Sequence, residues 1–161
     1  MYIQLYYFIF SAIIDGHCFI AIDLGIAIDT SRAAYENWPH ILPFLQSLIK
    51  QFEVVGKSRI GIITYSDEAR IEIPFGGILG RSGLFKTETT YKERLSQIQP
   101  NQNGFQRRTD LALNKAIELF YNGRRQVPKA LIVLEHGGII GKYMIFFVIY
   151  WNINTRYITN V

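Results

Sequence analysis

The sequence predicts an open α/β sheet in which mostly parallel strands are covered by helices. Three observations support this fold class. The chain has 161 residues, the size of one ordinary domain, and 49% of them are hydrophobic, which is enough for a substantial core. Nearly continuous apolar runs, typical of parallel strands buried on both faces, alternate with amphipathic stretches. These segments follow one another without an internal repeat or a low-complexity tract.

The first strand and the first helix have the clearest patterns. An apolar run over residues 20–28 predicts a buried strand, which ends at Asp29. After it, apolar residues recur at spacings of three and four, which indicates the buried face of a helix. They are Trp38, Ile41, Leu42, Leu45, Leu48, Ile49 and Phe52. Pro39 and Pro43 must lie in the first two turns of this helix or kink it.

The remaining elements complete the alternation. Residues 58–65 predict a second buried strand, and residues 69–75 alternate polar and apolar side chains, as in a half-exposed edge strand. A short helix is expected over residues 89–98, and a longer one follows it. The expected buried face of the longer helix comprises Leu113, Ala116, Ile117 and Phe120. Residues 130–134 predict another central strand.

Both ends of the chain are apolar and differ from the domain expected over residues 20–137. Residues 1–19 predict a signal-like segment or an extra strand. Residues 138–161 form a divergent tail, in which residues 143–153 are rich in aromatic and β-branched side chains and predict a buried strand. This run is too short for the roughly 20 residues of a membrane-spanning helix, so we expect no membrane span.

The charge pattern argues against a nucleic-acid partner. The formal net charge is +4, from 17 Lys and Arg and 13 Asp and Glu. Basic residues occur as short pairs, Arg107–Arg108 and Arg124–Arg125, and not as a long stripe. These pairs permit an anionic partner such as a sulfated glycan, although solvated surface charge is the simpler explanation. Cys18, the one cysteine, excludes an internal disulfide.

Four segments carry a resemblance to a known family. They are IDLGIAIDTS, RIGIITYSDEARIEIPF, RRTDLALNKAIELF and KALIVLEHG, in this order. Together they resemble a von Willebrand factor type A domain over residues 22–137. The resemblance implies a doubly wound, Rossmann-like sheet with helices on both faces. It also implies a non-enzymatic, protein-binding or adhesion module, extracellular or secreted, of the kind found in matrix and cell-adhesion proteins.

The family carries a metal-ion-dependent adhesion site, and this chain matches it in part. Asp29, Ser31 and Thr109 fall on ligand positions of the family, while Ala33 and His136 replace a serine and an aspartate. Mg²⁺ prefers six oxygen ligands, and Ala33 offers none, while an imidazole suits zinc, copper or nickel better. We therefore expect a degenerate site with weak or absent dependence on divalent cations, and no other cofactor.

Other residues near this site are candidate contacts for a protein partner. They are Arg107, Arg108 and His136. Glu135 could replace the missing aspartate, but neighbouring side chains of a regular strand face opposite ways, so it would point away from the side that His136 faces. A purely structural role is also open, because Thr109 followed by Asp110 makes a good helix N-cap.

The tail departs from the family. After Gly137 the family pattern calls for a helix and at least two more strands. Here only about eight residues would join the strand at 130–134 to a parallel partner in the tail, fewer than a crossover normally takes. We therefore expect a sheet truncated after its fourth main strand. A short substitute strand and a truncated or misspliced reading of a longer gene both remain open.

Enzyme classes find little support in the sequence. Gly56-Lys57-Ser58 is similar to the end of a phosphate-binding loop, but the required glycine is replaced by Gln51. A recognisable nucleophile context is also lacking. The alternative to an adhesion module is therefore a structural fragment of a larger matrix or membrane-anchored protein, without binding activity of its own.

Overall fold

The computed structural model describes residues 22–35, 37–53, 58–75, 88–101, 103–136 and 143–151. Its strands form one sheet in the order β3-β2-β1-β4-β5. They are β1 (Asp23–Asp29), β2 (Arg59–Tyr65), β3 (Ala69–Ile73), β4 (Lys129–His136) and β5 (Tyr143–Trp151). The helices are α2 (Arg32–Tyr35), α3 (Trp38–Glu53), α4 (Glu88–Gln97) and α5 (Thr109–Tyr121).

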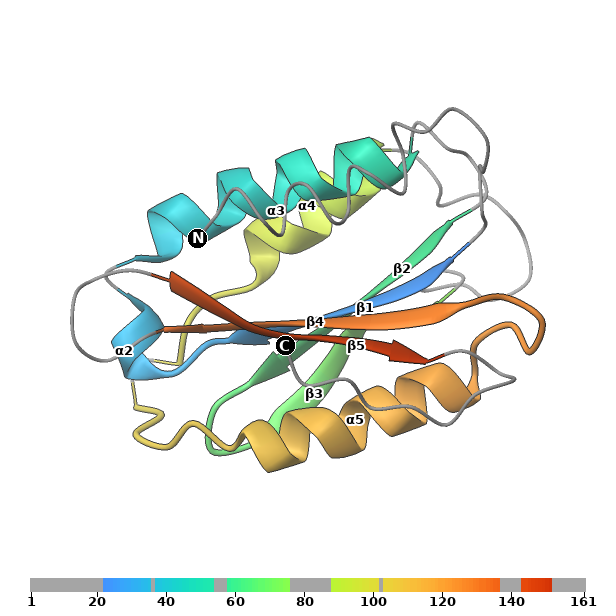
Figure 1. Cartoon of the computed structure of the whole chain (residues 1–161). Helices are drawn as coiled ribbons and strands as arrows, with labels where there is room; N and C mark the ends of the chain where they lie inside the picture. The colour runs from blue at the N-terminus through green and yellow to red at the C-terminus, as the bar shows by residue number, and fades with distance from the viewer. Residues whose placement is uncertain are drawn as a thin grey trace.

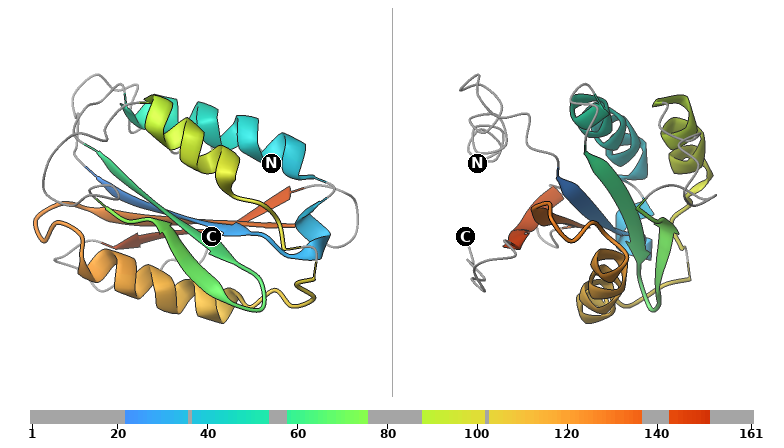
Figure 2. Two further views of the ribbon diagram at one scale, coloured as in Figure 1. Left: turned by 180° about the vertical axis from the view of Figure 1, so that it is seen from behind. Right: turned by 90° about the vertical axis from the view of Figure 1, so that its right-hand side faces the viewer.

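The sheet is open and mixed, as the sequence predicted. The central strand β1 pairs in parallel with both β2 and β4. At one edge β3, which lies in the predicted half-exposed edge strand 69–75, runs antiparallel to β2. The helices form the outer layers, with α3 and α4 on one face and α5 on the other (Figures 1 and 2). The predicted α/β fold with helices on both faces is therefore confirmed.

Part of the tail joins the sheet as β5. This strand pairs antiparallel with β4, from Lys129 opposite Trp151 to His136 opposite Tyr143. An antiparallel neighbour needs only a short connection, whereas a parallel one needs a long crossover. The connection is too short for a parallel partner, but it is long enough because the chain reverses and β5 runs antiparallel to β4. The predicted segment 1–19 and, within the predicted tail 138–161, residues 138–142 and 152–161 lie outside the described residues.

Each face of the sheet has its own core. Along β1, Ile26 and Ile28 pack with α3 and α4, while Ala27 between them packs with α5. This alternation is the two-residue period of a strand whose two faces are both covered. On one side Tyr91 of α4 also donates a hydrogen bond to the carbonyl of Ile60, at 3.0 Å. The predicted continuous apolar runs are therefore explained by two cores that share one sheet.

The packing of α5 corrects one sequence prediction. Leu113 and Ile117 were expected to be buried, but both are exposed. The buried face instead comprises Ala112, Ala116 and Leu119. Small residues let the helix lie close to the sheet at a point where the strands carry glycine. A Cβ atom added to Gly61 would lie 2.7 Å from Cδ2 of Leu119.

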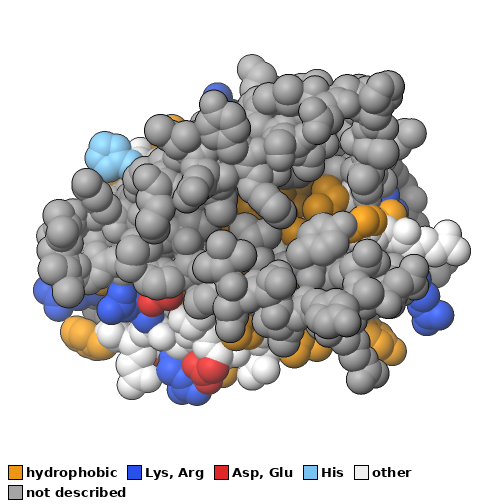
Figure 3. Space-filling model, viewed as in Figure 1, with side chains coloured by type: hydrophobic (Ala, Val, Ile, Leu, Met, Phe, Trp, Pro, Cys, Tyr) orange, Lys and Arg blue, Asp and Glu red, His pale blue; other side chains and the backbone are white. Residues whose placement is uncertain are grey.

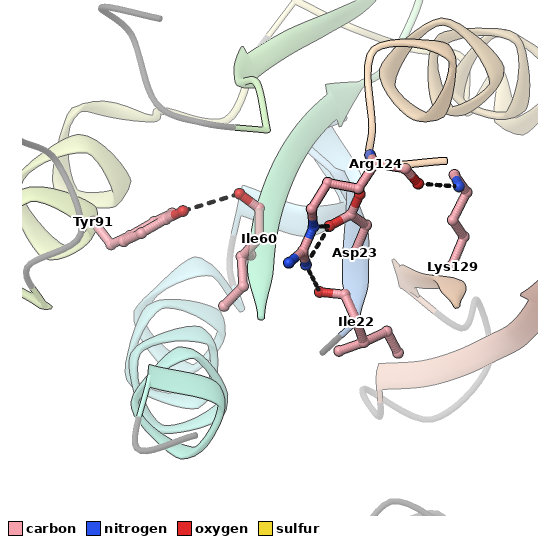
Figure 4. A network of polar contacts seen from close by, with 6 residues as sticks. All are labelled: Ile22, Asp23, Ile60, Tyr91, Arg124 and Lys129. Carbon is pink, nitrogen blue, oxygen red and sulfur yellow. Dashed lines mark hydrogen bonds and ion pairs between the residues drawn. The ribbon is translucent and has the colours of Figure 1, made fainter. Parts of the chain in front are cut away.

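A buried ion pair closes the edge of the sheet where β1 begins (Figure 4). Asp23 is fully buried and accepts hydrogen bonds from Nε of Arg124, at 2.8 Å, and from the Arg124 backbone N–H, at 2.6 Å. Lys129 donates in turn to the Arg124 carbonyl, at 2.7 Å. The two arginines of the predicted basic pair therefore have different settings, because Arg124 is partly buried against Asp23 while Arg125 is exposed.

Candidate functional site

Three side chains converge where the central parallel strands end. Asp29 lies level with Tyr65 across the β1–β2 pair, and Ile28 lies level with Leu134 across the β1–β4 pair, so the next residue, Glu135, is level with Asp29. Two residues earlier in these strands, the side chains pack on the α5 face; they are Ala27, Ile63 and Val133. Because strand side chains alternate, those of Asp29, Tyr65 and Glu135 lie on this same face.

The first turn of α5 faces these strand ends. Thr109 is the first residue of the helix, and its Oγ1 lies 3.5 Å from Oε2 of Glu135. The predicted capping role of Thr109 is wrong, since the N-cap residue is Arg108 and no side chain caps the helix. The Thr109 hydroxyl is consequently turned towards the sheet. The positive end of the α5 dipole also favours carboxylates at this position.

Glu135 lies in the site, contrary to the expectation that it would point away. The site occupies the α5 face of the sheet, and the alternation along β4 places Glu135 on that face. Burial raises the pKa of Glu135, the charge of Arg107 lowers it, and the charge of Asp29 raises it again. The backbone of His136 ends β4, but its side chain lies outside the part of the structure that is described.

The turn after β1 is held by its own backbone and side chains. The Ser31 N–H donates to Oδ1 of Asp29 at 2.8 Å. The backbone N–H and the hydroxyl of Thr30 both donate to the carbonyl of Tyr65, at 2.8 and 3.1 Å. Asp29 and the Ser31 backbone thus also have a structural role in this strand-to-loop turn. Ala33, by contrast, is exposed in α2 and brings no oxygen to the site.

Two buried hydroxyls remain without a hydrogen-bonding partner among the described residues. They are Oγ of Ser31 and the phenol oxygen of Tyr65, whose residues are 1% and 0% exposed. Burial raises the pKa of Tyr65, and the charges of Glu135 and Asp29 raise it further. The nearby Thr109 and Arg107 lower the pKa of Tyr65. Unsatisfied buried hydroxyls are costly, so this edge of the sheet is adapted to a polar partner.

The oxygens of the site only partly match a hard cation. Asp29 and Glu135 supply carboxylates, and Ser31 and Thr109 supply hydroxyls, which are ligand types that Mg²⁺ accepts. However, Nη1 of Arg107 lies 3.7 Å from Oε1 of Glu135, and a positive charge there opposes a metal ion. Within the described ranges, no group of three His, Cys, Asp or Glu side chains is placed so that it could hold a metal ion. The residues as arranged therefore do not complete a cation site.

The loop before α5 presents an exposed aromatic side chain beside the site. Phe105 is 76% exposed, and the guanidinium of Arg32 lies 5.9 Å from its ring centroid. The carboxylate of Asp67 holds this loop by accepting the N–H groups of Phe105 and Gln106, at 3.2 and 2.9 Å. Nothing periodic marks Phe105, so its role could not be inferred from the pattern.

Charged side chains surround this loop. Figure 3 shows basic and acidic side chains together around the start of α5, at the lower left of the view. The predicted contact residues Arg107 and Arg108 have separate partners there. Arg107 faces Glu135, whereas Arg108 donates two hydrogen bonds to Asp110, at 2.8 and 2.7 Å. Only Arg107 of this basic pair therefore lies beside the carboxylates of the site.

Solved structures with a similar fold include a matrix protein and a pili tip protein. Proximal thread matrix protein 1 from the mussel byssus matches 75% of this chain and 32% of its own length, with 22% identity and a TM-score of 0.61. The vWF domain of the type V pili tip protein Mfa5 from Porphyromonas gingivalis matches 73% of this chain and 38% of its own, with 16% identity and a TM-score of 0.60. This chain therefore spans about a third of their length.

A further structure of the mussel protein, described as having a zinc-occupied MIDAS motif, matches 66% of this chain and 27% of its own, at 23% identity and a TM-score of 0.54. At these identities the likeness shows the fold. No helix in the described ranges has the length and apolar character needed to cross a membrane. The von Willebrand factor type A domain family matches residues 23–138, which is most of the chain. The chain therefore belongs to the von Willebrand factor type A domain family.

Proposed function

We propose that this chain is a non-enzymatic protein-binding module that recognises an extracellular matrix or cell-surface partner. Domains of this family generally mediate adhesion between proteins, and the similar structures include a matrix protein and a pilus tip protein. The observation that carries the proposal is the exposed Phe105, held in place beside the strand-end site. Exposed aromatic side chains flanked by arginines are typical of the residues that dominate the energy of protein interfaces.

The contact surface combines Phe105 with the basic residues around it. Arg32 stacks near the ring of Phe105, and Arg107 and Arg108 follow in the same loop. A partner that offers a carboxylate or another anionic group beside an apolar side chain would complement this surface. His136 ends β4 and is a candidate contact as well.

Binding is proposed to depend weakly or not at all on divalent cations. In the family, a metal ion receives an acidic group of the partner. In this chain Ala33 offers no ligand, and Arg107 supplies a fixed positive charge next to Glu135. A guanidinium can receive a carboxylate through two parallel hydrogen bonds, so it can serve recognition without a metal. A sulfated glycan would suit the same positive charges, but it would make less use of the exposed Phe105.

Surface plasmon resonance against immobilised fibrillar collagen, laminin and fibronectin tests the proposal, with the same protein injected in Mg²⁺ and in EDTA. We expect binding to at least one of these proteins, with similar affinity in both buffers. Phe105→Ala should weaken this binding at least ~tenfold, as loss of a central aromatic contact does. Tyr121→Ala is the matched control, because Tyr121 is also an exposed aromatic residue (88%) but ends α5, away from the site.

Equal loss in the two variants would assign binding to general surface hydrophobicity and contradict the proposal. Loss of binding in EDTA would contradict its metal-independence. A folded chain that binds none of the three proteins would favour the alternative of a structural fragment. That alternative has one observation in its favour, since α5 exposes a stripe that a neighbouring domain could cover; it comprises Leu113, Ile117 and Tyr121.

A further inference from the structure

The strand-end site holds two carboxylates in a confined space. Asp29 is 1% exposed, and the side chain of Glu135 is 19% exposed. The two residues lie level with each other at the ends of the neighbouring parallel strands β1 and β4. Neighbouring like charges in a poorly hydrated setting are unfavourable unless a positive charge lies between or beside them. A cation, from the solvent or from the chain, would therefore stabilise this arrangement.

The chain supplies a cation through Arg107. Its Nη1 lies 3.7 Å from Oε1 of Glu135, so the guanidinium lies beside one carboxylate of the site. The neighbouring Arg108 is directed to Asp110 instead, through two short hydrogen bonds.

Hydroxyl groups add to the carboxylates at this end of the sheet. The hydroxyls of Ser31 and Tyr65 are buried and lack hydrogen-bonding partners among the described residues. Tyr65 lies level with Asp29 across the β1–β2 pair, and the Ser31 N–H donates to Oδ1 of Asp29 at 2.8 Å. Carboxylate and hydroxyl oxygens are the ligand types that a hard cation accepts. The unpartnered hydroxyls are an observation independent of the acidic residues themselves.

We propose that the guanidinium of Arg107 replaces the divalent cation of this site, and that removal of its charge converts Asp29, Ser31, Thr109 and Glu135 into a binding site for Mn²⁺ or Mg²⁺. The site is thus closed to metal by the positive charge of the chain itself. This inference rests on the same site as the proposed function, but not on the proposed partner, because its test needs none.

The test compares wild-type protein with Arg107→Gln and with Arg125→Gln, which removes an equal charge from an exposed position. Melting temperatures are measured in EDTA and in 5 mM MnCl₂, and Mn²⁺ binding is titrated by calorimetry. We expect the wild type and Arg125→Gln to respond to Mn²⁺ by less than about one degree. Arg107→Gln should melt lower in EDTA, rise by several degrees in Mn²⁺ and bind one ion, as a ligand selective for the folded state does.

Equal stabilisation of the wild type by Mn²⁺ would overturn the proposal, because Arg107 would not then exclude the ion. Failure of Mn²⁺ to bind or stabilise folded Arg107→Gln would overturn it as well. If Arg107→Gln does not fold in EDTA, the variant Arg107→Gln/Glu135→Gln decides, since it removes one charge of each sign. The proposal requires this double variant to fold without Mn²⁺ and to gain nothing from it, and an unfolded double variant would refute charge compensation by Arg107.

Discussion

The hydroxyl of Thr109 lies 3.5 Å from a carboxylate oxygen of Glu135, although 26 positions separate the two residues in the sequence. This relationship joins the first turn of α5 to the end of β4. It places the second carboxylate of the site on the face that also carries Asp29 and Tyr65. The carboxyl ends of parallel strands are where open α/β sheets place their ligands.

Glu135 should make the stability of the protein depend on pH. Its pKa is raised in the folded state, mainly by burial, so the folded protein binds this proton more tightly than the unfolded chain does. The contribution of Glu135 to stability is therefore most favourable below its ordinary pKa of about 4.5 and declines as the pH rises through the higher folded value. We expect Glu135→Gln to remove this decline in urea unfolding curves recorded between pH 4 and 8.

Glu93→Gln is the control for that series, because Glu93 lies on the exposed surface of α4. The control should keep the pH dependence of the wild type. Identical profiles for Glu135→Gln and the wild type would show that the Glu135 carboxyl does not experience the buried setting described here.

Arg124→Ala should destabilise the fold strongly. It leaves Asp23 buried without the guanidinium, and breaking a buried ion pair in this way typically costs about 3–5 kcal/mol. Arg125→Ala alters the next residue, which is exposed, and should change the free energy of unfolding by less than about 0.5 kcal/mol. Chemical denaturation of both variants measures the difference, and equal small losses would mean that Asp23 is hydrated or protonated in the folded protein.

Gly61→Ala should be destabilised by overpacking, at a cost of about 1–3 kcal/mol. The new Cβ would lie 2.7 Å from Cδ2 and 2.8 Å from Cδ1 of Leu119, beneath α5. A smaller residue at the helix position should relieve the contact. We therefore expect Gly61→Ala/Leu119→Val to be more stable than the sum of the two single changes predicts, in a double-mutant cycle of unfolding free energies.

Asp67→Ala should loosen the loop that presents Phe105 without unfolding the domain. The carboxylate accepts two loop N–H groups, and its loss leaves them to water. Amide hydrogen exchange at Phe105 and Gln106 should accelerate at least ~tenfold, which corresponds to about 1.4 kcal/mol of local protection. Glu68→Ala removes a neighbouring carboxylate that pairs with Arg70, and exchange at the loop should remain unchanged in it.

The sequence predicts most of this sheet because its signals are local. Buried runs mark β1, β2 and β4, and the three-and-four spacing marks α3, whose interior contains Pro43 as expected. The face of α5 was predicted less well, since hydrophobicity favoured Leu113 and Ile117 over the small residues that fit close to the glycines of the sheet. Close packing against the sheet decides which face of α5 is buried. It depends on the shape of the surface that the helix contacts, which the sequence of the helix alone does not reveal.

The candidate site was predicted in part for a related reason. Asp29, Ser31 and Thr109 could be named from their spacing, and the structure places them at one edge of the sheet. Glu135 was set aside only relative to His136, because alternation along a strand gives relative directions and does not say which face holds the site. Which face holds the site depends on where α5 begins, and that position is set by the three-dimensional packing of the helix.

The most direct measurement is a crystal structure of the wild-type protein grown in 10 mM MnCl₂, with anomalous scattering used to locate manganese. The account predicts the guanidinium of Arg107 beside Glu135 and no anomalous peak among Asp29, Ser31 and Thr109. A manganese peak bound by these residues, with Arg107 displaced into solvent, would contradict it.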